Sequence, residues 1–285
     1  MINFELAKKT FKEYLQNYNL KDGKIDLKIR HTFHVVNASE YIAKELALNN
    51  EDIELAKMIA LLHDIGRFEQ LRIYNSFLDY KTIDHAVLGN EILFKDNLIR
   101  KFLEDTQYDE IVSKAILNHN KFSIEDNLSP KELLHAKIIR DADKLDIFRV
   151  RIEDSIENVI DNCSKEILEN STISENIFND FFNNKLILST DRKTPMDFWV
   201  SGIAYIFDFN FSCSLKFVKN MDYINKMVDK FDYKNAETKE RMEIIRKHAI
   251  EFIVSILGTD SKMLKTDSSR YDQSLNSKRR EMSTT

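Results

Sequence analysis

The sequence predicts an all-α protein, and three observations support this fold class. The 285 residues include only five glycines and two prolines, so few positions interrupt a helix. Apolar residues recur three and four positions apart in nearly every long segment, which is the period of an amphipathic helix. Hydrophobic residues make up 43% of the chain, enough for the core of one large domain or two small ones.

Three helices are expected in the amino-terminal part of the chain. The first spans residues 4–18. The second begins near Arg30 and presents one apolar face as far as Leu46. The third follows two acidic residues, covers residues 53–64 and ends at Gly66, which suits the left-handed position after a helix.

Further helices are indicated by their starting signals. Thr82 is a candidate cap for a helix through Phe94, and another helix is expected over residues 108–118. The strongest local signal is Ser129-Pro130-Lys131-Glu132, which has the pattern of a capping box with proline in the first turn. A second such start, Thr194-Pro195-Met196-Asp197, opens a helical layer that runs to about Leu257.

The composition argues against several classes of function. A formal net charge of −5 leaves no bulk positive field for a nucleic-acid polymer. The longest apolar stretch, Phe198–Phe211, is too short for a bilayer, which needs about 20 residues. No secretory signal is apparent at the amino terminus. Cys163 and Cys213 lack the spacing of a disulfide framework or a thiolate zinc site. We expect a cytoplasmic protein with no membrane partner.

Histidines and aspartates at predicted helix ends form a pattern typical of a metal site. His63 and Asp64 are adjacent and follow the apolar run Ala56–Leu62. An imidazole and a carboxylate at such a place can bind one cation, and the carboxylate can bridge to a second. The other potential ligands, in chain order, are His31, His85, His119 and Asp143.

In these stretches the sequence resembles the HD-domain superfamily of metal-dependent phosphohydrolases. The matching segments are His31-Thr32-Phe33-His34-Val35, Leu61-Leu62-His63-Asp64-Ile65-Gly66-Arg67, His85-Ala86-Val87-Leu88-Gly89, Ile116-Leu117-Asn118-His119-Asn120 and Asp141-Ala142-Asp143-Lys144-Leu145-Asp146. Together they cover roughly residues 28 to 150. The resemblance implies an HD-domain helical bundle with additional C-terminal helices. The cyclic-dinucleotide branch is disfavoured, since its Gly-Tyr-Pro signature is missing after His119.

The resemblance also implies a set of metal ligands. One metal ion would be held by His31, His63, Asp64 and Asp143. A second would be held by His85 and His119, with Asp64 bridging the two ions. Histidine and carboxylate ligands favour iron or manganese over magnesium. We therefore expect a binuclear centre with two divalent cations.

The implied reaction is hydrolysis of a small phosphorylated compound, with a nucleotide or a related phosphate ester as the expected substrate. Two cations neutralise phosphate oxygens and lower the pKa of a bridging water enough to supply hydroxide near neutral pH. Asp64, Arg67 and Lys144 are the candidate catalytic residues, the last two placed to meet phosphate oxygens. Surface salt bridges explain Arg67 and Lys144 equally well.

Several other titratable residues receive weaker assignments. His34 is a candidate for substrate contact or proton transfer, but a half-buried position beside the site is favoured. Asp141 and Asp146 are candidates to orient a metal ligand through a hydrogen bond, with solvated or capping roles as the alternatives. His135 and His248 are expected at ordinary amphipathic positions, outside the site.

Two alternative functions stay open at the level of sequence. A branch of the same superfamily uses this six-ligand set to hold two irons that activate dioxygen, so the chain could be a di-iron oxygenase. A non-catalytic nucleotide sensor is the other alternative, and the oligomeric state does not follow from the sequence.

The domain organisation follows from these assignments. We expect a single all-α domain over residues 1–258, with a metal-binding core at about 28–150 and a C-terminal helical layer at about 194–258. A polar, serine-rich loop is expected over residues 170–176. Apolar content falls from Thr259 onward, which predicts a disordered tail over 259–285.

Overall fold

The structure, a computed structural model, describes residues 2–258. Its elements are helices, and no β-strand occurs among these residues, which confirms the predicted all-α fold class. Within the same residues, no helix combines the length and apolar character that crossing a bilayer requires. The predicted tail over 259–285 lies outside the described residues.

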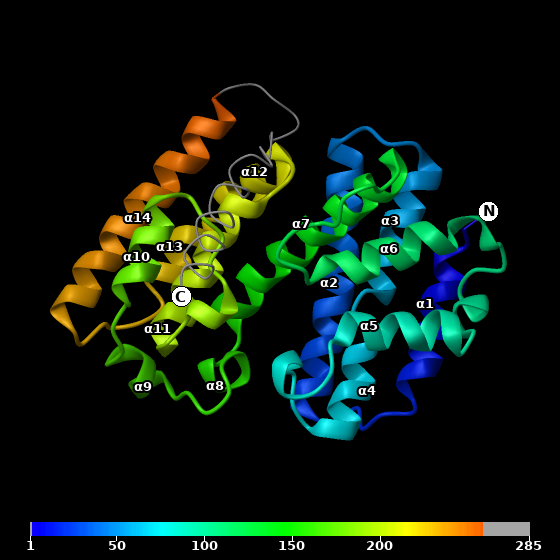
Figure 1. Cartoon of the computed structure of the whole chain (residues 1–285), viewed down its shortest axis with the longest axis horizontal. Helices are drawn as coiled ribbons and strands as arrows, with labels where there is room; N and C mark the ends of the chain where they lie inside the picture. Colours follow the sequence, from blue (N-terminus) through cyan, green and yellow to red (C-terminus); the bar gives the residue numbers. More distant parts are fainter. Residues whose placement is uncertain (1, 259–285) are drawn as a thin grey trace, which may run out of the picture.

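The amino-terminal half forms one group of helices, on the right in Figure 1. Its α-helices are α1 (Phe4–Leu15), α2 (Gly23–Glu45), α3 (Asn50–Leu62), α4 (Ile65–Tyr74), α5 (His85–Asn90) and α6 (Asp109–His119). Its shorter helical segments are the 3₁₀-helices η1 (Asp79–Lys81), η3 (Leu98–Lys101) and η4 (Thr106–Tyr108) and the π-helix η2 (Glu91–Lys95).

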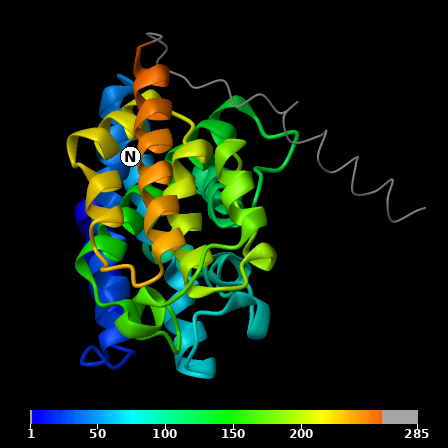
Figure 2. The same cartoon turned by 90° about the vertical axis from the view of Figure 1, so that its left-hand side faces the viewer.

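The carboxyl-terminal half forms a second group, on the left in Figure 1. It contains α8 (Ile156–Val159), α9 (Lys165–Glu169), α10 (Glu175–Phe182), η5 (Ser189–Asp191), α11 (Pro195–Ile203), η6 (Ala204–Asp208), α12 (Ser212–Asn220), α13 (Tyr223–Val228) and α14 (Ala236–Leu257). Figure 2 shows α14 on the outer side of this group. The sequence did not predict α8, α9 and α10, which are short.

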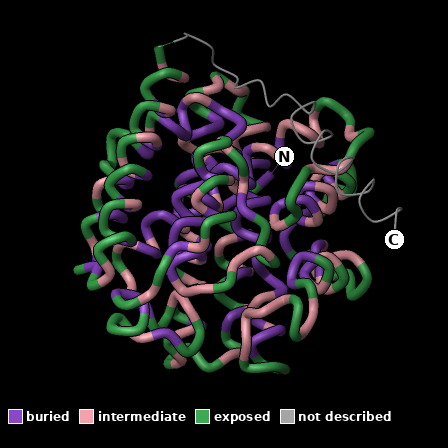
Figure 3. Tube along the Cα trace, turned by 60° about the vertical axis from the view of Figure 1, so that its left-hand side comes forward, coloured by how far each residue is buried: buried purple, intermediate pink, exposed green. Residues whose placement is uncertain are grey.

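Helix α7 (Pro130–Glu153) joins the two groups. Its start has the predicted capping box, since Ser129 accepts from Glu132 N and the Glu132 carboxylate accepts from Ser129 N. At 1.5 Å per residue, its 24 residues extend about 36 Å. It packs against α2, α3 and α6 on one side and against α11, α12 and α13 on the other. Buried positions accordingly gather in the interior (Figure 3).

Asp141 on α7 ties the second group to the first. Its buried carboxylate accepts hydrogen bonds from Asn210 N at 2.9 Å, Phe211 N at 3.1 Å and Ser214 Oγ at 2.7 Å. The start of α12 is thereby fixed to the middle of α7. Asp141 contacts no candidate ligand through these bonds, so its predicted role beside a metal ligand is wrong.

Local signals fixed several helix boundaries as predicted and missed others. Thr194 and Asp197 form the second predicted capping box, which begins α11. The predicted start of α2 near Arg30 is wrong, because the Asp22 carboxylate caps the helix seven residues earlier, at Lys24 N and Ile25 N. The predicted cap at Thr82 is also wrong, since the Asp84 side chain caps α5.

Gly66 does not have the predicted left-handed conformation, since no glycine of the described residues has a positive φ. It lies in the first turn of α4, against α5. A Cβ at this position would lie 2.2 Å from His85 O and 2.6 Å from Gly89 N. The glycine is therefore required for close approach of two helices, and this approach positions His85.

We predict that Gly66→Ala destabilises the protein, because the added methyl group meets backbone atoms that must shift. Overpacking of this kind typically costs about 1–3 kcal/mol. The matched control is Gly23→Ala, where an added Cβ meets nothing within 4 Å. The control should be neutral or slightly stabilising. Urea unfolding followed by circular dichroism measures the free energy of unfolding of each variant. Equal free energies of unfolding for Gly66→Ala and the unaltered chain would contradict the close approach.

Candidate metal centre

Six candidate ligands from five parts of the chain meet between the first helices and α7. His31 lies on α2, and His63 and Asp64 form the junction between α3 and α4. The remaining three are the first residue of α5, the last residue of α6 and a residue in the middle of α7, namely His85, His119 and Asp143. All four histidines and Asp64 are buried, with exposed fractions of 4% or less.

The Asp64 carboxylate lies between two pairs of histidines. Its Oδ2 is 3.6 Å from His31 Nε2 and 3.5 Å from His63 Nε2. Its Oδ1 is 3.2 Å from His85 Nε2 and 3.7 Å from His119 Nε2. Each oxygen therefore belongs to a separate three-residue cluster with ligand spacing.

Asp143 completes the cluster on the Oδ2 side of Asp64. Its Oδ1 lies 3.1 Å from His31 Nε2 and 4.0 Å from His63 Nε2. The four side chains His31, His63, Asp64 and Asp143 thus surround one position, as the resemblance implied for the first ion. His85 and His119 surround the other.

The outer nitrogen of every histidine in the cluster has an oxygen partner at 2.7 Å. Nδ1 of His63 donates to Ala60 O, and Nδ1 of His119 donates to Ile116 O. The other two partners are carboxylates, Asp146 for His31 and Asp79 for His85. Such partners fix the tautomer with the proton on Nδ1 and leave the Nε2 lone pair directed at the centre.

These inward lone pairs fit a bound cation. Nε2 of His85 and Nε2 of His119 face each other at 3.0 Å, and two lone pairs at that distance repel unless a proton or metal ion lies between them. Nε2 of His63 is buried and has no hydrogen-bond partner among the described residues. A buried polar atom without a partner is costly, so the donor set favours a metal ion.

Burial and neighbouring charges set the protonation of the centre. Burial alone would raise the pKa of Asp64, but Lys28 and the neighbouring histidines lower it well below its usual value. Burial lowers the pKa of His63 to about 4, so its imidazole is neutral at pH 7. Burial and Lys28 act to lower the pKa of His31, yet the carboxylates of Asp143 and Asp146 outweigh them and raise it to about 9. A metal ion bound through His31 Nε2 therefore displaces a proton.

The family model of the HD domain matches residues 29–148. The chain contains an HD domain. The matched residues include all six candidate ligands, and HD domains bind divalent metal ions. No solved structure matches the chain. The helices from α8 onward lie after the matched residues.

Lys28 and Asp79 belong to the centre, although no sequence pattern pointed to either residue. Lys28 Nζ lies 2.7 Å from Asp64 Oδ2. Asp79 accepts from His85 and also pairs with Arg67, whose Nη1 is 2.6 Å from Asp79 Oδ1. Lys28 precedes the matched HD residues by one position, and Asp79 lies in η1, where no local pattern distinguishes it from other loop carboxylates.

The centre opens into a cavity of about 410 Å³ that the HD domain shares with later residues. Arg67 and Lys144 both line it, and both are also engaged in ion pairs. Lys144 Nζ lies 2.8 Å from Asp208 Oδ2 of η6. Lys144 is buried, so a surface salt bridge does not describe its pair with Asp208, whereas the pair of Arg67 with Asp79 is partly exposed.

The structure confirms some of the roles that the sequence indicated for other titratable residues and contradicts others. Asp146 orients His31, as considered from the sequence. His34 is exposed, so its predicted half-buried position is wrong: α2 turns this side chain away from the face that carries His31. His135 pairs with Asp52, and His248 bonds Asn184 among aromatic rings of the second group, so neither lies in the centre.

We predict that divalent metal ions stabilise the HD domain. Chelation by EDTA should lower the midpoint of thermal unfolding, because an ion that binds only the folded chain contributes about 2.7 kcal/mol at a concentration one hundred times its dissociation constant. His63→Ala should abolish most of the difference between EDTA and manganese. The control is His34→Ala, which removes an exposed histidine from the same region. If His63→Ala kept the full metal effect, the assignment of this ligand would be wrong.

Proposed function

We propose that this protein is a metal-dependent phosphohydrolase that cleaves a phosphate ester of a small molecule, a nucleotide or a related compound. The observation that carries the proposal is the position of Asp64 between two histidine pairs at the base of a cavity with many basic side chains. Ligands of this type hold hydrolytic metal ions, and basic side chains attract phosphate. The HD domain supports the coarser assignment to a metal-dependent hydrolase superfamily.

Two divalent cations, iron or manganese, are the proposed cofactors. His31, His63, Asp64 and Asp143 would hold one, and His85 and His119 the other, with Asp64 shared. When bound, such ions neutralise phosphate oxygens and lower the pKa of a water at the centre. The separation of the two Asp64 oxygens toward different histidine pairs supports the binuclear proposal over a single ion.

Arg67 and Lys144 would bind and orient the phosphate group. Arg67 is held by Asp79 and by Phe77 O, and Lys144 by Asp208 and Arg140 O, so both cations have fixed positions at the cavity wall. A positioned guanidinium fork and an ammonium group align the phosphorus with an attacking water without large loss of side-chain entropy. Asp64 would act by holding the ions, since its lowered pKa keeps it ionised.

The surroundings of the centre also favour a small substrate. A cavity of about 410 Å³ is within the usual range for small-molecule sites. We propose a small phosphorylated partner without a nucleic-acid polymer or a membrane. A cytoplasmic location and a single domain over residues 1–258 stay predictions.

We predict that phosphate release from a panel of phosphate esters requires manganese or iron and is lost in Asp64→Asn. The loss should be about a thousandfold or more, because bound cations contribute several kcal/mol to stabilisation of the transition state. Lys144→Met should raise KM about tenfold, since one charge-assisted contact to phosphate is removed. Malachite-green detection of phosphate measures both.

The control is Lys131→Met, which removes a lysine from the same helix that pairs with Glu51 and Asp52 outside the cavity. Its kinetics should match those of the unaltered chain. Consumption of dioxygen by the iron-loaded protein, without phosphate release, would replace the proposal with the oxygenase. Tight nucleotide binding without turnover would replace it with the sensor.

A further inference from the structure

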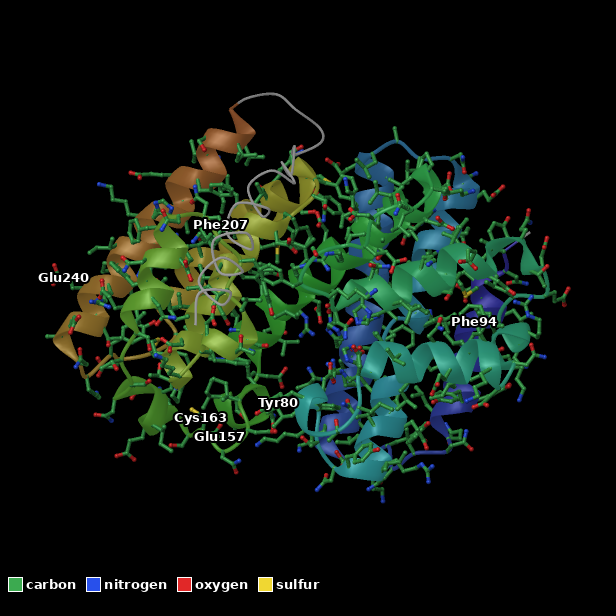
Figure 4. The ribbon with its side chains drawn as sticks, in the orientation of Figure 1. Tyr80, Phe94, Glu157, Cys163, Phe207 and Glu240 are labelled. Carbon is green, nitrogen blue, oxygen red and sulfur yellow. The ribbon has the colours of Figure 1, made fainter. Side chains whose placement is uncertain are left out.

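One wall of the cavity comes from residues beyond the HD domain. The segment 183–194, which connects α10 to α11, lies along it, and α11 and η6 complete the wall. The lining residues of this wall are Leu186, Ile187, Leu188, Ser189, Arg192, Ser201 and Tyr205. Figure 4 shows Tyr80 of η1 at the edge of the HD domain that faces these later residues. The HD domain and the later residues therefore each form part of the wall of this cavity.

Basic side chains outnumber carboxylates around this cavity, and most of them have a carboxylate partner. The pairs are Lys28 with Asp64, Arg67 with Asp79, Lys121 with Glu125, and both Arg140 and Lys144 with Asp208. Arg192 differs from these five cations. Within residues 2–258 it takes part in no ion pair, although it lines the same cavity.

Arg192 is nonetheless held in place. Its guanidinium lies over the Phe198 ring, 4.9 Å from the centroid, and Nη1 is 3.4 Å from Ser201 Oγ. Nε donates to Ser189 O at 3.3 Å. Burial lowers the pKa of this half-buried guanidinium, an effect that the phenol groups of Tyr205 and Tyr80 oppose.

All of these fixed partners are neutral. A cation withdrawn from water and held only by neutral groups is stabilised strongly when an anion pairs with it. The planar fork of arginine suits phosphate and carboxylate in particular. The carboxylates that line the cavity, Asp64, Asp79 and Asp143, are paired with other cations or belong to the candidate metal centre, so an anionic ligand in the cavity would find Arg192 without an ion-pair partner among the described residues.

We infer that Arg192 binds a second anionic group of the substrate, on the wall of the cavity that residues after the HD domain form. The inference rests on the proposed function and narrows its substrate class. The substrate is a small phosphate ester that carries, apart from the phosphate to be cleaved, another phosphate or a carboxylate. Arg192 acts in specificity, while the HD domain supplies the metal chemistry.

Non-hydrolysable ligands test this without turnover. Alkylphosphonates of three to six carbons carry one anionic end, and the α,ω-diphosphonates of the same lengths carry two. Isothermal titration calorimetry of the manganese-loaded full chain under anaerobic conditions gives the affinity of each. At the best length, the diphosphonate should bind at least tenfold more tightly than the alkylphosphonate.

Arg192→Gln should remove this preference: diphosphonate affinity falls about tenfold, and alkylphosphonate affinity changes by less than twofold. Arg192→Lys should retain part of it. The matched control is Arg241→Gln, which removes an arginine of the second group that also lies over a ring, Phe178 at 4.7 Å, but pairs with Glu175 and Glu237. Thermal melts confirm that each variant is folded.

The outcomes separate this inference from the proposed function. A chain that shows no preference for diphosphonates at any length, or an Arg192→Gln variant that weakens both ligand classes equally, overturns the second-anion site, even where metal-dependent phosphate release persists. A preference that disappears in Arg192→Gln supports the site. If that same protein released no phosphate from any ester, the hydrolase proposal alone would fail.

Discussion

The buried carboxylate of Asp64 is the constraint around which this site is arranged. Both of its oxygens face imidazole nitrogens, and Lys28 approaches one of them to 2.7 Å. A carboxylate withdrawn from water in this way is tolerated only where positive charge compensates it. Lys28 supplies one compensating charge, and the inward-facing Nε2 atoms of the four histidines provide ligand positions for metal cations beside both oxygens of Asp64.

Other parts of the fold hold these side chains at fixed positions relative to one another. Gly66 lets α4 approach the start of α5 closely enough for His85 to face Asp64. Helix α7 contributes Asp143 to the centre and, from neighbouring positions, Asp141 to the second group of helices and Asp146 to His31. One rigid helix therefore sets the position of the metal centre relative to the wall that carries Arg192.

Sequence reasoning succeeded where the signal was local. The capping boxes at Ser129 and Thr194 are specified by residues three positions apart, and both form as predicted. The six candidate ligands were found because their order along the chain resembles a family pattern, and the structure brings them together. Their roles as ligands stay proposals, as do those of Arg67 and Lys144.

Sequence reasoning failed where a contact joins distant segments. Gly66 was assigned to a helix cap, because nothing local reveals the approach of the His85 carbonyl. In the sequence, nothing distinguishes Lys28, Asp79 and Arg192 from ordinary surface residues. Their candidate roles become visible only when the folded chain places all three on one cavity. Asp141 lies two residues before Asp143, a spacing that suggested a role in orienting a metal ligand. In the structure its carboxylate instead accepts a hydrogen bond from Ser214 of α12.

Because the two walls of the cavity come from different parts of the chain, substitutions in one wall can alter the binding site without altering the other. The candidate ligands sit on helices and at helix junctions, where an inserted residue would rotate every following side chain by about 100°. The segment 183–194 is mostly irregular and tolerates replacement far better. Substitutions or a replacement loop in this short connection would change which compounds fit the cavity and leave the candidate metal ligands in place. The segment is therefore a suitable starting point for redesign of specificity.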